Sequence, residues 1–532
     1  MKGYNRFGAM LDCSRNGVLT VDTVIKFADV VSKVGYDSIM LYTEDTYEVD
    51  GEPYFGYMRG GYSADEIRKI DRELKARGVE LIPCIQTLAH FTNLCKLPHF
   101  SDVIDVNDVL LIDEPKTYAL IDKMFATIAS CFSSRTINIG MDEAHMVGLG
   151  KYLDKHGFEN RTELLLRHLA KVCGIAEKYG FKPLMWSDMF FRLMNHGEYY
   201  SRNVRLGDDV KALLPENVSL AYWDYYHKNK ADYDAMFDAH IDTKRDVWFF
   251  GGAWTWAGFA PLNDYSLLTM LPAIESAKER RISNVFMTMW GDNGNECSVF
   301  GVLPALVRIA KAAAGEGEDS AEKAFELVSD ITYGDFMKLD LPNKRKADQP
   351  CVRNENLAKC LFYSDPFMGY FDNIVEKIAI DYDGYARELG KFSSDETFGY
   401  IFKATSDLCS FLAVKYDLGA RTRKAYSAND ADELVRLAEK VYPEAIKHLE
   451  RFFESFRTLW FTERKPFGFE VQEARIGGLT LRLKSCAERI KAYVTGKIPA
   501  IEELEKEILP MTDEDFMHLN VYEKLVSFGK IG

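Results

Sequence analysis

The stretch GGYSADEIRKIDRELKARGVELIPCIQTLAH (60–90) contains the repeating unit from which the fold is built. A helical pattern over 64–77 ends at Gly78, and a β-rich apolar run over 79–86 follows it at once. Glycine is the residue with which helices most often end, because it adopts the left-handed conformation without strain. An apolar run of this length, bounded by a turn, predicts a buried strand. The stretch therefore predicts a helix followed by a strand of a parallel sheet.

The same alternation extends from the start of the chain to about residue 315. Strands are predicted over 6–12, 37–43, 79–86, 136–141, 182–187, 218–223, 247–253 and 285–290. Helical patterns occupy 21–34, 64–77, 118–132, 161–179, 232–241, 267–280 and 303–314. Eight strands that alternate with helices are typical of a closed (β/α)₈ TIM barrel. An open doubly wound sheet is the alternative, but no Gly-rich phosphate-binding motif follows the first strand.

The strand signal ends near residue 320, and long charged helical patterns replace it. They cover 320–332, 371–390, 400–416, 431–458 and 479–493, and LPNKRKADQP (341–350) reads as a loop. We therefore expect a catalytic barrel over 1–318 and an α-helical C-terminal domain, packed on the barrel, over 319–532.

The composition excludes several classes of function. A formal net charge of -15 argues against nucleic acid and against anionic membrane surfaces, which both attract basic proteins. None of the ten cysteines forms a C-x-x-C pair, and the ten histidines show no metal-binding spacing. We expect no metal or cofactor. No apolar segment is long enough to span a membrane, and the amino terminus lacks a signal sequence, so a cytoplasmic location is expected.

Aromatic and charged side chains gather where the predicted strands end, the face on which TIM barrels carry their active sites. Five of the seven tryptophans lie there: Trp186, Trp223, Trp254, Trp256 and Trp290. Flat rings stack on the apolar faces of sugars, while charged groups bind the hydroxyls. Arg15, Asp188 and Asp292 are candidates for that second role. Packing in the core is the alternative for any one tryptophan, and a surface ion pair is the alternative for Arg15.

Asp142 and Glu143 follow the fourth predicted strand directly. Along a regular strand they would face opposite sides, but where the strand gives way to a loop both can enter one pocket. The alternative is that they cap the helix that follows, because acidic residues favour a helix start. Their place within a ring of aromatic residues favours a catalytic pair.

The run INIGMDEAHMVGLGKY (137–152) resembles the Asp-Glu signature of glycoside hydrolase family 20, the β-N-acetylhexosaminidases. Two more stretches resemble this family: MLDCSRN (10–16) and residues 60–90 with their terminal His90. Two others resemble its bacterial branch with a helical C-terminal domain: LYTEDTYEVDGEPYFGYMRGGY (41–62) and KPFGFEVQEARIGGL (465–479). The Trp290-Gly-Asp292 motif also matches. One departure is the tyrosine that follows the seventh strand in the family. Here Tyr225, after the sixth strand, is the expected substitute, with Tyr226 as its rival.

The resemblance implies an exo-acting enzyme that removes terminal β-linked N-acetylglucosamine or N-acetylgalactosamine from oligosaccharides. Glu143 would be the general acid and base, and Asp142 would orient the substrate's acetamido group, whose oxygen is the nucleophile. Arg15, His90, Asp292 and the five tryptophans would bind the sugar, with Asp45 behind His90. Two alternatives stay open: a double-displacement glycosidase that uses Glu143 and Asp292, and a barrel that binds amino sugars without cleaving them.

Overall fold

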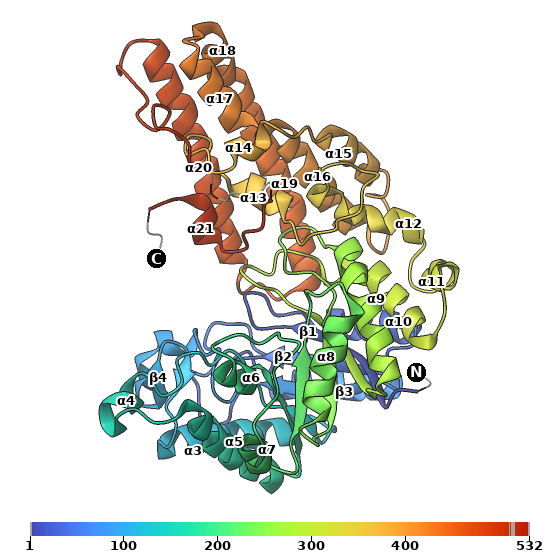
Figure 1. Cartoon of the computed structure of the whole chain (residues 1–532). Helices are drawn as coiled ribbons and strands as arrows, with labels where there is room; N and C mark the ends of the chain where they lie inside the picture. Colours follow the sequence, from blue (N-terminus) through green and yellow to red (C-terminus); the bar gives the residue numbers. More distant parts are fainter. Residues whose placement is uncertain (1–2, 510, 512–515, 530–532) are drawn as a thin grey trace. The chain divides into compact units, whose positions relative to one another are not determined.

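The computed structural model of the chain describes residues 3–509, 511 and 516–529 and divides into two compact units (Figure 1). The first comprises Met1–Ala253, Ser266–Met289 and Ala305–Val328. The second comprises Trp254–Tyr265, Trp290–Pro304 and Ser329–Gly532. Two short segments that follow barrel strands thus group with the helical part of the chain.

The first unit contains a closed barrel of eight parallel strands, so the predicted fold class is confirmed. The order around the barrel is β1-β10-β9-β8-β7-β6-β3-β2, and β1 closes it by pairing with β10. The strands are β1 (Arg6–Asp12), β2 (Ser38–Thr43), β3 (Glu80–Ile85), β6 (Thr136–Asn138), β7 (Lys182–Trp186), β8 (Ser219–Trp223), β9 (Val247–Gly252) and β10 (Asn284–Met289). Their side chains are almost all buried, because inward residues fill the barrel and outward ones meet the helices.

Helices alternate with these strands. They are α1 (Val21–Ser32), α2 (Ala64–Ala76), α3 (Pro115–Cys131), α4 (Lys151–His156), α5 (Arg161–Lys178), α6 (Asp188–Met194), α7 (Asp208–Leu213), α8 (Lys230–Ile241), α9 (Asn263–Glu279), α10 (Leu303–Ala314) and α11 (Glu318–Phe325). In the opening stretch, Ser63 and Glu66 form a capping box that fixes the start of α2.

Some elements differ from the sequence-based expectation. Strand β6 stops at Asn138, three residues early, because Gly140 and Met141 have positive φ angles of 76° and 73°. An antiparallel pair, β4 (Ile104–Val106) and β5 (Val109–Leu110), lies in the loop after β3. Strands of two or three residues carry too short a pattern to be recognised in a sequence.

The second unit is helical. Its helices are α12 (Tyr333–Phe336), α13 (Leu357–Tyr363), α14 (Asp372–Val375), α15 (Tyr382–Gly390), α16 (Gly399–Lys415), α17 (Leu418–Ser427), α18 (Ala431–Arg436), α19 (Tyr442–Glu463), α20 (Phe469–Val494) and α21 (Tyr522–Val526). Helix α16 packs on α15 and α19, and α19 packs on α20 (Figure 1). Within the described residues, no helix is both long and apolar enough to cross a membrane.

Candidate functional site at the carboxyl ends of the strands

The Asp142–Glu143 pair lies in an irregular turn just after β6. Met141 and Glu143 both have positive φ, at 73° and 49°, which is uncommon for residues with side chains. The Asp142 side chain is only 9% exposed, whereas that of Glu143 is 43% exposed. Two adjacent carboxylates thus have different surroundings: one is held inside the protein, and the other faces solvent.

Asp142 is held by two side chains from the end of β3 and the loop after it. The Gln86 amide donates a hydrogen bond of 2.8 Å to one carboxylate oxygen, and His90 Nε2 lies 3.1 Å from the other. Burial alone would raise the pKa of Asp142, but His90, followed by Gln86 and Arg15, outweighs this and lowers it. Asp142 is therefore a fixed negative charge at neutral pH.

His90 connects the carboxylates of this cluster. Its Nε2 lies 3.8 Å from Glu143, and its Nδ1 lies 4.0 Å from Glu44. Burial lowers the pKa of His90, but the charge and hydrogen bond of Asp142 oppose this, and the pKa rises to about 9. The expectation that Asp45 stands behind His90 was wrong. Asp45 is instead paired at 3.3 Å with Arg59 from the loop after β2.

Arg15, after β1, lies against two further carboxylates. Its Nε is 3.5 Å from Asp12 and 3.6 Å from Glu44, and its guanidinium lies over the Tyr42 ring at 5.6 Å. Burial raises the pKa of Glu44 to about 7, although Arg15 and His90 lower it in part. The Arg15 side chain keeps 24% of its surface exposed, so its position allows contact with a ligand.

Asp188 has a different place from the one expected. Its residue is fully buried, so it is not a rim group that reads sugar hydroxyls. One oxygen accepts the backbone N–H of Glu143 at 3.2 Å and lies 3.2 Å from Arg192 Nε. The other has no hydrogen-bond partner among the described residues. Burial, then the charges of Asp142 and Glu143, raise the pKa of Asp188 to about 7. Sequence reasoning missed this backbone contact because it joins two strand ends.

The aromatic residues predicted for the site in the first unit lie at the end of β7 and at or just after the end of β8. Trp186 is 1% exposed and meets Phe250 edge-on at 4.6 Å. Trp223 is 8% exposed and stacks on Tyr225 at 5.3 Å, with an interplanar angle of 21°. Tyr226, the rival of Tyr225, is 42% exposed.

The remaining predicted site residues belong to the second unit. Trp254 and Trp256, both buried, stack on each other at 4.2 Å. The Thr255 hydroxyl donates to the carbonyl oxygen of Trp290 at 2.7 Å, so the segments after β9 and β10 are tied together. Asp292 is half-buried. The structure thus gathers Arg15, His90, Asp142 and Glu143 in the first unit and the remaining indoles and Asp292 in the second.

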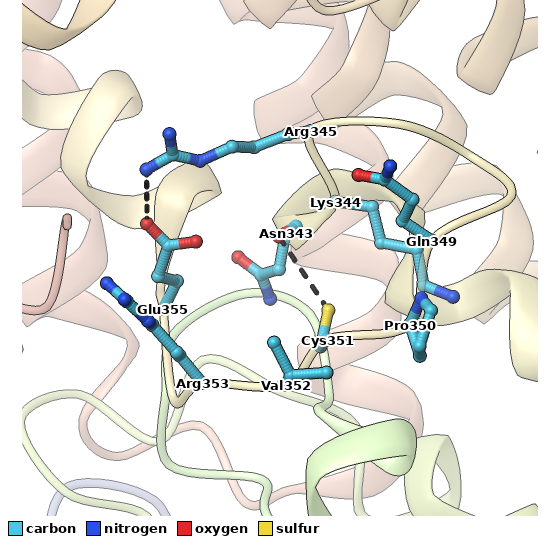
Figure 2. Close-up of a pocket in the computed structure, with 9 residues that line it drawn as sticks. All are labelled: Asn343, Lys344, Arg345, Gln349, Pro350, Cys351, Val352, Arg353 and Glu355. Atoms are coloured by element: carbon cyan, nitrogen blue, oxygen red, sulfur yellow. Dashed lines mark hydrogen bonds and ion pairs between the residues drawn. The ribbon is translucent and has the colours of Figure 1, made fainter. Parts of the chain in front are cut away.

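A hollow of about 540 Å³ also lies in the second unit (Figure 2). Its one carboxylate, Glu355, is already paired with Arg345 at 2.6 Å, so the hollow offers no acid–base pair. Cys351 on its wall lies near Asp264 and Asp340 in a grouping that could hold a metal ion. Here Asp340 instead accepts backbone N–H groups at the start of α9, and Asp264 pairs with Lys344 at 2.6 Å. These carboxylates already have structural partners.

A closed parallel barrel with two adjacent carboxylates after one strand, a histidine beside them and aromatic residues after the next strands has the groups for acid–base chemistry on a sugar. The family model "Glycosyl hydrolase family 20, catalytic domain" matches residues 4–291, more than half of the chain. A second model, "Glycoside Hydrolase 20C C-terminal domain", matches residues 334–521. The chain therefore belongs to glycoside hydrolase family 20, as the resemblance predicted.

The chain is also similar to individual known proteins. Hexosaminidase D from Bos taurus is 24% identical over 237 residues, which are 43% of this chain and 63% of the relative. Hexosaminidase D from Homo sapiens is 24% identical over 203 residues, 36% of this chain and 39% of the relative. The chain thus spans less than two thirds of either protein. The exo-β-N-acetylglucosaminidase from Vibrio harveyi superposes with a TM-score of 0.45 at 16% identity, over 65% of this chain and 60% of that one.

Proposed function

We propose that the protein is an exo-β-N-acetylhexosaminidase that releases terminal β-linked N-acetylglucosamine or N-acetylgalactosamine from oligosaccharides. The observation that supports this most is the unequal pair after β6. Asp142 is buried and fixed by Gln86 and His90, whereas Glu143 is half exposed beside it. One carboxylate can stay ionised and orient a group, while its neighbour can exchange a proton with substrate and water.

Glu143 is the proposed general acid and base. In the first step it protonates the oxygen of the leaving group, and in the second it removes a proton from the attacking water. His90 Nε2 lies 3.8 Å from the Glu143 carboxylate, close enough to hold that side chain in place beside the substrate. His90 is therefore proposed to assist the acid rather than to act as one.

Asp142 is the proposed partner of the substrate's 2-acetamido group. Its carboxylate accepts the acetamido N–H, so the carbonyl oxygen is held for attack on C1, and its charge offsets that of the oxazolinium intermediate. This nucleophile is already attached to the sugar, so little orientational entropy is lost. Water then opens the oxazolinium ion, and the anomeric configuration is retained. Tyr225, stacked on Trp223, is proposed to donate to the acetamido oxygen.

The other predicted residues are proposed to bind the sugar. Arg15 and Asp292 would bind hydroxyls of the non-reducing end, which a closed pocket needs for exo action. The indoles would stack on the ring and enclose the acetamido methyl: Trp186, Trp223, Trp254, Trp256 and Trp290. The cytoplasmic location expected from the sequence stays a prediction that cell fractionation checks.

The mechanism is tested with aryl glycosides that differ only at C2. The 2-acetamido substrates should turn over, whereas their 2-hydroxy counterparts should not. Successive fluorination of the acetyl methyl should lower the rate in graded steps, because it withdraws electrons from the attacking oxygen. A rate that is flat across the fluorine series, with a 2-fluoro sugar trapped on an Asp or Glu, would establish a double-displacement enzyme. Binding of N-acetylglucosamine without turnover would instead establish a sugar-binding protein.

A further inference from the structure

The segment after β10 contains a turn in an unusual conformation. Asn293, Gly294 and Asn295 have successive positive φ angles of 51°, 135° and 54°. Only glycine adopts φ near 135° readily, and three such residues in a row persist only where surrounding contacts hold them. Asp292 lies at the start of this turn. The position of Asp292 therefore depends on the contacts that hold residues 293–296.

Helix α20 holds the turn from one side. Gln472 and Arg475 lie on the same face of α20, because they are three residues apart. The Gln472 amide donates to the Gly294 carbonyl oxygen at 2.7 Å. Arg475 donates to the carbonyl oxygen of Asn293 at 2.8 Å and to its side-chain oxygen at 3.2 Å. A β-carbon on Gly294 would lie 2.6 Å from Arg475 Nη1, so helix and turn are in close contact.

Lys359 of α13 holds the turn from the other side. Its side chain is fully buried, and Nζ donates to the Asn293 carbonyl oxygen at 3.0 Å. Nζ also lies 3.0 Å from Glu296, whose other oxygen lies 3.4 Å from Arg475. The stem of Lys359 packs on Gly258, where a β-carbon would lie 2.8 Å from the Lys359 β-carbon. One lysine thus contacts both segments that carry the second unit's indoles.

Two neighbouring residues, Glu463 and Arg464, hold Asn295 and the residues that follow it. Glu463, at the end of α19, accepts the backbone N–H of Val299 at 3.1 Å and the hydroxyl of Ser298. Arg464 donates to the side-chain oxygen of Asn295 at 3.0 Å. Burying so many charges is expensive, and buried ion pairs often contribute no more stability than apolar packing of the same volume. What these charges provide instead is a defined geometry for one turn.

We propose that Arg475 and Lys359 are positioning residues for Asp292, so that the helical unit sets the affinity of the enzyme for its terminal sugar. This inference rests on the proposed function, in which Asp292 binds sugar hydroxyls. It gives the helical unit a role in substrate binding: the unit holds the turn that follows Asp292, whereas the Asp142–Glu143 pair follows β6 and is held by Gln86 and His90 after β3.

The test compares two arginines of the same helix. Arg475→Met removes the contacts to the turn, while Arg482→Met removes an ion pair with Asp365, 2.6 Å long, that does not involve the turn. For Arg475→Met we expect the Michaelis constant for an aryl N-acetylglucosaminide to rise roughly tenfold or more, with kcat within about threefold. Arg482→Met should leave both constants unchanged. Amide hydrogen exchange over residues 290–297 should accelerate in Arg475→Met alone.

Asn293→Gly is the second variant, because it leaves every buried charge in place and keeps a residue suited to positive φ. It removes the side-chain oxygen that accepts from Arg475 Nη2 and keeps the backbone carbonyl that accepts from Nη1, so it should raise the Michaelis constant as well, by less. Unchanged Michaelis constants in both Arg475→Met and Asn293→Gly would overturn the inference. Equal changes in Arg475→Met and Arg482→Met would overturn it as well. A wild-type protein that cleaves no hexosaminide would refute the proposed function instead. The inference would then fail if hydrogen exchange over 290–297 were the same in both arginine variants.

Discussion

Asp142 and Glu143 are neighbours in the chain, yet their surroundings give them different chemistry. Asp142 is surrounded by the Gln86 amide and the charged His90, which together keep it ionised despite burial. Glu143 has its backbone held by Asp188, while its side chain reaches solvent. The positive φ of Glu143 places adjacent side chains in an arrangement that a regular strand could not provide. Their different surroundings therefore suit the two adjacent carboxylates to different roles in the proposed mechanism.

If Glu143 is the general acid, its replacement should lower kcat by an amount that depends on the leaving group of the substrate. Glu143→Gln should lower kcat on natural disaccharides by roughly 10²–10⁴-fold, because the leaving oxygen is then not protonated. A nitrophenyl glycoside, whose leaving group needs little protonation, should lose far less in the first step. Steady-state rates on both substrates measure this. Glu177→Gln, at an exposed position of α5, is the control and should change neither rate. Equal losses on both substrates would argue against the acid role.

His90 predicts a particular dependence of stability on pH. Its pKa is raised from 6.5 to about 9 by Asp142, so the folded protein holds the proton more tightly than the unfolded chain. The stabilisation is complete below about pH 6.5 and is lost as pH rises through about 9. His90→Asn should remove this fall in the free energy of unfolding, measured from pH 6 to 10.

His168→Asn is the matched control for that experiment. His168 is also fully buried, but burial lowers its pKa to about 4, so it is neutral over the whole range. Above about pH 7.5, where a histidine of the unfolded chain is neutral as well, its replacement should shift stability by a constant amount and leave the slope unchanged. An unchanged slope in His90→Asn would show that the ion pair with Asp142 does not form.

Among the helices and strands, those with long periodic patterns were predictable from the sequence, whereas contacts between loops of different strands were not. The eight strands lie within one or two residues of the predicted runs except β6, which Gly140 and Met141 end early. The expected helix over 371–390 is broken between α14 and α15, while the one over 431–458 includes a π-helical turn at Leu437–Val441. The Asp-Glu pair was recognisable because it is local. The contacts of Asp188 and His90 depend on how loops from different strands meet.

At the end of β6, replacement of Gly140 should destabilise the protein. A β-carbon on Gly140, which has φ of 76°, would overlap the Gln86 side chain that holds Asp142. Gly140→Ala should therefore cost about 2–4 kcal/mol in stability, from strain plus displacement of Gln86, and lower kcat at least roughly tenfold. Gly180→Ala tests strain alone, because Gly180 has φ of 73° with no atom within 4 Å. It should cost about 1 kcal/mol and leave kcat unchanged. Equal effects would show that Gln86 does not position Asp142.

At the scale of the whole molecule, the chain crosses between its two units several times. Residues 254–265 and 290–304 group with the helical unit, although barrel strands and helices surround them in sequence. Phe259 packs among Phe362, Phe452 and Phe456 of that unit, and Glu296 and Ser298 are bonded to Lys359, Arg475 and Glu463. A boundary drawn at one point in the sequence therefore separates groups that are buried together.

This interleaving predicts that the barrel segment does not work alone. A fragment of residues 1–325 lacks the residues that bury Phe259 and neutralise Glu296, so it keeps an exposed aromatic ring and an unpaired carboxylate. Exposing the formerly buried ring of Phe259 costs about 1.5–3 kcal/mol, a considerable share of the stability of a typical domain. The fragment should be insoluble, or should unfold at a much lower temperature, in solubility and circular dichroism measurements. Co-expression of residues 326–532 as a separate chain is the control, and it should restore solubility in part, because the missing partners return. A soluble 1–325 fragment with the full activity of the whole chain would show that the helical unit is dispensable and that the barrel alone completes the sugar site.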